Sequence, residues 1–215
     1  MTWRYGFLRA VRIGPPTDEY ETTEVAFAGT IATLARLPGT QFLHELVIGA
    51  FQYDDFPASW NDCVEAIAEY GVPPNLAALE FNCGGMWDIS STELGDLSPA
   101  YPRLGKLREL RIQLGAMKFG AIVLPELRGI EITTGGLQQD NLASFRAAKW
   151  PKLEKLALCI GETGNDYGCN VELADLRWIF AAENLANVRH LALANSSLAD
   201  QIVTELATSK ILGQL

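Results

Sequence analysis

Apolar residues recur along this chain at one short spacing: a first residue, a second three positions later and a third two positions after that. The spacing occurs seven times in order, in LRAVRI (8–13), LHELVI (43–48), LAALEF (76–81), LRELRI (107–112), LRGIEI (127–132), LEKLAL (153–158) and VRHLAL (188–193). We number each segment from its first apolar residue, so that positions 4 and 6 are both apolar. Since alternate residues of a strand share a face, each segment predicts a short strand with one buried face.

The segments return at intervals of 35, 33, 31, 20, 26 and 35 residues, which indicates units that stack on one another. Between them, apolar residues at helical spacing predict helices over 24–37, 59–71, 139–150, 171–186 and 198–209. Ser59 is the expected N-cap of the second helix, and Gly71 is its expected end. The interval 113–126 is predicted to be a loop.

Glycine and proline mark fixed places in these units. Glycine occupies position 9 of four consecutive units, as Gly84, Gly115, Gly135 and Gly161. Proline stands two residues before position 1 in three units, as Pro74, Pro125 and Pro151. Glycine suits a sharp turn after a strand because it adopts backbone angles closed to other residues, and proline suits an extended lead-in.

The pattern LxxLxLxxGxL resembles the leucine-rich repeat, most closely the divergent repeats of bacterial cytosolic proteins. LPELRGIEITTGGL (124–137) and WPKLEKLALCIGETGNDYG (150–168) carry the resemblance best, and it spans residues 7–215. The resemblance implies one α/β domain over 1–215, a solenoid of about seven repeats. Its curved parallel sheet would form the concave side, and helices and loops the convex side. The chain departs from the family in its uneven unit lengths and in glycine where asparagine or cysteine is usual.

The C-terminal end of this array is expected to lack a complete cap. Leu215 lies 27 residues after Val188, where position 1 of a further strand is due. Solenoids normally protect their terminal strands. We therefore expect further chain, self-association or a partner at this end.

Positions 3 and 5 alternate with the buried positions, so their side chains are expected on the concave face of the sheet. The candidate partner-binding residues there are Glu45, Glu80, Glu109, Arg111, Glu131, Lys155 and His190. Two loops that follow strands add Trp87, Asp166 and Tyr167. Such a surface indicates a non-enzymatic scaffold that binds a protein; the alternatives are that the charges only keep an exposed face soluble and that Trp87 packs under its own loop.

No set of residues in the sequence forms a recognisable catalytic site. The glutamates at positions 3 and 5 lie beside Arg111, which favours solvated ion pairs over acid–base catalysis. The alternative is an enzyme or enzyme subunit with a thiol site of Cys159 and His190, although no third, orienting residue accompanies them. A further alternative is a purely structural part of a larger assembly. We expect no enzyme activity and no catalytic residue.

The composition of the chain excludes several classes of binding partner and cofactor. The chain has 215 residues, 48% of them apolar, and a formal net charge of −9, which favours a folded protein and opposes binding to nucleic acid or anionic membranes. Four cysteines without a CxxC pair and two histidines predict no metal site. The glycine-rich segment 161–173 matches neither an EF-hand nor a phosphate-binding loop, so no cofactor is expected. Without an apolar signal segment, the predicted location is the cytoplasm, with free thiols.

Overall fold

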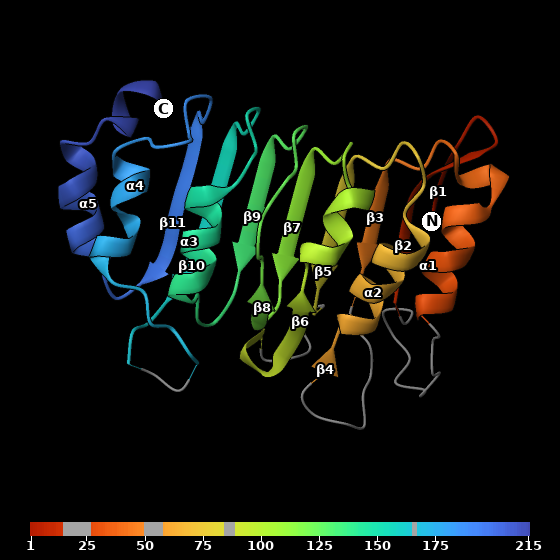
Figure 1. Cartoon of the computed structure of the whole chain (residues 1–215), viewed down its shortest axis with the longest axis horizontal. Helices are drawn as coiled ribbons and strands as arrows, with labels where there is room; N and C mark the ends of the chain where they lie inside the picture. The colour runs from red at the N-terminus through yellow and green to blue at the C-terminus, as the bar shows by residue number, and fades with distance from the viewer. Residues whose placement is uncertain (15–26, 50–57, 84–88, 165–166) are drawn as a thin grey trace.

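A long, mostly parallel sheet organises the chain (Figure 1). The computed structural model describes residues 1–14, 27–49, 58–83, 89–164 and 167–215. In spatial order the sheet contains β1 (Thr2–Arg4), β2 (Phe7–Ile13), β3 (Glu45–Ile48), β5 (Ala78–Asn82), β7 (Glu109–Gln113), β9 (Gly129–Thr133), β10 (Lys155–Gly161) and β11 (His190–Ser196). Only β1, at one edge, pairs antiparallel with its neighbour. The predicted α/β class is confirmed.

All seven predicted strands form, and they align position for position. Position 3 runs across the sheet as Ala10, Glu45, Ala78, Glu109, Gly129, Lys155 and His190. Position 5 runs as Arg12, Val47, Glu80, Arg111, Glu131, Ala157 and Ala192. The register therefore sets every apolar position 4 and 6 on the other face, where they form the core in six strands and pack against it in β11.

Helices cover one face of the sheet and leave the other face open (Figure 1). The α-helices are α1 (Phe27–Arg36), α2 (Asn61–Tyr70), α3 (Gln139–Ala147), α4 (Arg177–Phe180) and α5 (Ala199–Ala207). Short 3-10 helices are η1 (Pro38–Thr40), η2 (Ile89–Ser91), η3 (Ser98–Arg103), η4 (Leu173–Leu176) and η5 (Ile211–Gln214). The apolar stripes of the helices pack on positions 4 and 6 of the strands, as the alternation of strand and helix predicted.

Two of the predicted helices differ in detail. The helix predicted over 171–186 is instead the 3-10 helix η4 followed by the single turn α4, and it ends early because Ala182 and Asn184 adopt φ of 54° and 59°. In the helix at 59–71, the N-cap is Trp60 rather than Ser59. The Ser59 Oγ still accepts a hydrogen bond from the Asn61 N–H at 3.2 Å. The first predicted helix is observed from Phe27, and residues 24–26 lie outside the described residues.

The prediction of a loop over 113–126 holds for most of the interval, but the interval contains one short strand. A second, three-stranded parallel sheet contains β4 (Ala58–Ser59), β6 (Thr92–Asp96) and β8 (Ala116–Lys118). It lies beyond the carboxyl ends of the main strands (Figure 1). Its strands are too short to show a clear period in the sequence, which explains why the apolar pattern did not reveal them.

The C-terminal end of the sheet is less covered than the rest. Leu191 and Leu193 occupy positions 4 and 6 of β11 and are partly exposed, whereas the same positions are buried in the other six strands. The Gln214 side-chain amide donates hydrogen bonds to the Leu185 and Val188 carbonyls at 2.7 and 3.0 Å. These bonds anchor η5 to the turn that precedes β11. A partner at this end stays a prediction.

Candidate functional site

The open sheet face consists of the position 3 and position 5 side chains of the seven parallel strands. All seven candidate residues that the sequence assigned to it lie there: Glu45, Glu80, Glu109, Arg111, Glu131, Lys155 and His190. Arg111 and His190 are exposed, and the others are half-buried by their neighbours on adjacent strands. The register brings these charges together across segments that are far apart in the sequence.

Two ion pairs bridge adjacent strands of this face. The Lys155 ammonium lies 2.7 Å from the Glu131 carboxylate, and the Arg111 guanidinium lies 3.7 Å from the Glu80 carboxylate. The Asn82 amide also donates to Glu80, at 2.5 Å. Because the paired side chains stay between about a quarter and a half exposed, each pair stabilises the fold by only about 0–1 kcal/mol. Breaking either ion pair therefore costs little free energy when another charged surface approaches.

Two carboxylates of the open sheet face form no ion pair with any described residue. These are Glu45 on β3 and Glu109 on β7. Position 3 of the next strand is Gly129, where an added Cβ would collide with the Glu109 carboxylate. The Glu109 side chain thus lies across the gap that the glycine leaves. The middle of the face offers acceptor oxygens to a partner without the loss of an ion pair.

The predicted loop residues are only partly described. Tyr167 lies in the segment between β10 and η4 and is 53% exposed. Two hydrogen bonds fix this segment: the Asn170 side chain accepts from the Gln139 N–H of α3 at 2.8 Å, and within the segment the Thr163 hydroxyl donates to the Val171 carbonyl at 3.2 Å. Trp87 and Asp166 lie outside the described residues.

The structure does not bring Cys159 and His190 together. In the pairing of β10 with β11, Cys159 lies opposite Ala194, and His190 lies opposite Lys155. Four residues along a strand span about 13 Å, whereas proton transfer needs heavy atoms within about 3 Å. The geometry therefore gives no support to a thiol site made of these two residues.

Cys159 should react slowly with thiol reagents, because burial raises the pKa of its thiol above the ordinary value. Burial also raises the pKa of Cys63, to about 12, and Cys63, Cys83 and Cys169 are buried. We expect one thiol to react first in the native protein, with a rate that still rises above pH 8.5. Stopped-flow labelling with a disulfide reagent measures this rate, and Cys159→Ser should abolish the first phase. A fast reaction at pH 7 would contradict the expectation and indicate an activated thiol.

Neither a metal-binding group of side chains nor a membrane-spanning helix occurs among the described residues. Within them, no group of three or more His, Cys, Asp or Glu side chains is arranged to hold a metal ion. The same residues include no helix with the length and apolar character needed to cross a membrane.

Sequence reasoning missed a second polar surface, which we call the amino rim because it lies where the parallel strands begin. It consists of position 2 and of the residue before position 1 in each unit. The residues before position 1 are Phe7, Phe42, Asn75, Lys106, Glu126, Lys152 and Asn187, and those at position 2 are Arg9, His44, Ala77, Arg108, Arg128, Glu154 and Arg189. A shared pattern of backbone hydrogen bonds aligns these residues. The N–H groups at positions 2 and 3 of one unit donate to the position 2 carbonyl of the preceding unit, as those of Arg128 and Gly129 do to the Arg108 carbonyl at 2.8 and 2.9 Å.

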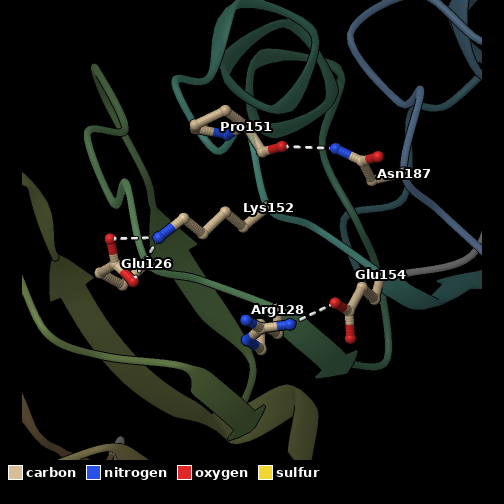
Figure 2. Close-up of polar contacts among 6 residues, drawn as sticks. All are labelled: Glu126, Arg128, Pro151, Lys152, Glu154 and Asn187. Carbon is tan, nitrogen blue, oxygen red and sulfur yellow. Dashed lines mark hydrogen bonds and ion pairs between the residues drawn. The ribbon is translucent and has the colours of Figure 1, made fainter.

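In its C-terminal half, the amino rim is a ladder of contacts between neighbouring units (Figure 2). The Lys152 ammonium lies 2.6 and 2.7 Å from the two Glu126 oxygens, and Arg128 pairs with Glu154. The Asn187 amide donates to the Pro151 carbonyl at 2.7 Å. Here most charges are satisfied within the chain, so these residues hold units together.

In its N-terminal half, the amino rim is positively charged. Burial lowers the pKa of His44, and the nearby Arg9 and Arg108 lower it further. Neither arginine forms an ion pair with a described residue. Aligning the seven segments by column would have revealed that position 2 is arginine in four of the seven units, in a chain of net charge −9.

Comparison with known proteins finds a similar fold in one solved structure and gives no information on function. No protein-family model and no curated protein matches the chain. A crystal structure of a protein from Bacteroides fragilis is similar, with a TM-score of 0.76 and 24% sequence identity over 86% of this chain. The match covers 53% of that protein, so the chain spans about half its length. At this identity the likeness shows that the two proteins share a fold.

Proposed function

We propose that this chain is a leucine-rich-repeat-like solenoid that binds another protein through its open sheet face. The observation that carries the proposal is the arrangement of seven polar side chains in two columns on a face that none of the described helices covers. The matching register of seven strands, each followed by a return segment, supports the solenoid assignment. The function follows from this surface together with analogy at the level of the fold.

The chemistry of the face suggests basic groups on the partner. Glu45 and Glu109 offer carboxylates that form no ion pair with a described residue. The ion pairs Glu80–Arg111 and Glu131–Lys155 can be replaced by pairs with a partner at a small cost in free energy. Charged groups arranged in this way steer encounter and select partners more than they add affinity. A partner with alternating basic and acidic side chains would complement the two columns.

Charge reversal on the open sheet face tests the proposal. We expect the triple variant Glu109→Lys, Arg111→Glu, Glu131→Lys to lose at least about tenfold in affinity for a protein captured by the wild-type chain. Affinity capture from cells of the source organism, followed by titration calorimetry with the purified partner, gives the measurement.

A matched control carries the same change in net charge on the helical side: Asp140→Lys, Arg177→Glu, Glu205→Lys on α3, α4 and α5. All three of these side chains are partly or fully exposed. We expect the control to bind as the wild type does. A partner whose affinity is indifferent to the open-face variant, or equally sensitive to the control, would refute binding through this face.

A further inference from the structure

A groove opens at the N-terminal end of the amino rim, separate from the open sheet face. Its volume is about 410 Å³, and its lining is Arg4, Tyr5, Phe7, Leu8, Arg9 and Phe42. The residues come from β1, from the turn that joins β1 to β2, from β2 itself and from the lead-in to β3. The groove thus depends on the pairing of three chain segments.

Aromatic side chains form the walls of this groove and stay in contact with water. The Phe7 and Phe42 rings meet edge to face, with their centroids 4.4 Å apart and an interplanar angle of 67°. They are 38% and 46% exposed, and Tyr5 is 86% exposed. Aromatic rings in a preformed hollow are the usual anchors of a protein interface, because a partner's apolar side chain removes their surface from water.

Arginines give the groove its charge. The Arg4 guanidinium lies 5.3 Å from the centroid of the Tyr5 ring, and Arg9 lies beside Phe7 in the lining. Neither guanidinium pairs with a carboxylate among the described residues. Arg9 also lies close enough to His44, the residue before β3, to lower the pKa of its imidazole, an effect second to that of burial.

We infer that this groove binds an acidic protein segment that carries an apolar anchor residue. The anchor would pack between Phe7 and Phe42, and flanking carboxylates would meet Arg4 and Arg9. A nucleic acid is a poorer match, because the net charge of −9 repels an extended polyanion while a short segment meets only the local positive field. The inference is independent of the role proposed for the open sheet face.

Three labelled peptides test the inference by fluorescence anisotropy. Each contains a central Leu-Trp pair, flanked by Glu in the first, by Ser in the second and by Lys in the third. We expect saturable binding of the Glu-flanked peptide alone. The double variant Arg4→Glu, Arg9→Glu and the single variant Phe42→Ala should each weaken it by at least about tenfold, because one removes the charge and the other a wall of the groove.

Control variants separate this groove from other surfaces. Lys118→Glu changes an exposed cation on β8 and should leave binding within about twofold of wild type, as should the triple variant of the open sheet face. Circular dichroism and thermal melting confirm that each variant is folded.

Any of the following results would overturn the inference: equal binding of the Ser- or Lys-flanked peptide, absence of saturable binding at millimolar protein, retention of binding in the Arg4/Arg9 variant, or displacement of the peptide by a single-stranded oligonucleotide. Light scattering that shows a dimer broken by Arg9→Glu would assign the groove to a second copy of this chain and would equally refute an acidic partner.

Discussion

Gly161→Ala is expected to lower the free energy of unfolding by about 3 kcal/mol. Gly161 ends β10 with φ of +95°, a region that side chains with a Cβ rarely occupy. A Cβ at this residue would also lie 2.5 Å from the Gly135 carbonyl oxygen and 3.1 Å from the Gly136 Cα. Both contacts are with backbone, so no side-chain rotation relieves them. Urea denaturation followed by circular dichroism measures the change.

Gly105→Ala is the matched control. A Cβ at Gly105 would meet nothing within 4 Å, and its φ lies outside the left-handed region. We expect a change within about 1 kcal/mol, in the stabilising direction, because alanine restricts the unfolded chain. Equal destabilisation by the two substitutions would show that loss of glycine flexibility, rather than the crowded turn after β10, determines the effect.

The glycine column illustrates what the sequence predicts and why it stops there. Position 9 glycines were expected to permit a sharp turn, and Gly161 does adopt a positive φ. Gly115 does not; there an added Cβ would collide with the carbonyl oxygens of Ile89 and Thr92. Thr92 begins β6 of the small sheet, which the apolar pattern did not predict. At Gly115 a tertiary contact, rather than a left-handed turn, leaves no room for a side chain. Gly84 lies outside the described residues.

The main sheet was predictable because its information is local and repeated. Each strand needs only two inward apolar residues two positions apart, and seven copies make the signal distinct. Helix ends were less predictable, since the left-handed conformations of Ala182 and Asn184 leave no mark in the apolar period. The two-residue strand β4 is too short to produce any period at all.

The same distinction holds for the candidate surfaces. Side chains of the open sheet face follow from parity along a strand, so their direction was predicted residue by residue. The groove at the amino rim depends on which units are neighbours: Phe7 and Phe42 are 35 residues apart in the sequence and meet only because β2 pairs with β3. A surface of this kind becomes visible only after the register is known.

Phe145→Ala should have the larger effect on stability, a loss of about 4 kcal/mol in the free energy of unfolding. Phe145 lies on α3 and is completely buried. Its ring meets Phe119, which follows β8, at a centroid distance of 4.7 Å and an angle of 62°, and Trp150 lies at 5.9 Å. Truncation leaves a cavity where α3, the segment after β8 and the lead-in to β10 converge. Urea denaturation monitored by tryptophan fluorescence measures the loss.

Phe42→Ala provides a comparison that holds the aromatic geometry nearly constant. The Phe7–Phe42 pair has almost the same separation and angle, 4.4 Å and 67°, but Phe42 is 46% exposed. We expect its truncation to cost less than about 1.5 kcal/mol, because the ring pair itself contributes only about 0.5–1.5 kcal/mol beyond burial. Similar losses from the two substitutions would contradict the view that burial decides stability here. The expected difference also matters for binding: a ring that contributes little to folding and lines an arginine-bearing groove remains free to contact a partner, so Phe42→Ala should weaken peptide binding by at least about tenfold in a chain that is still folded.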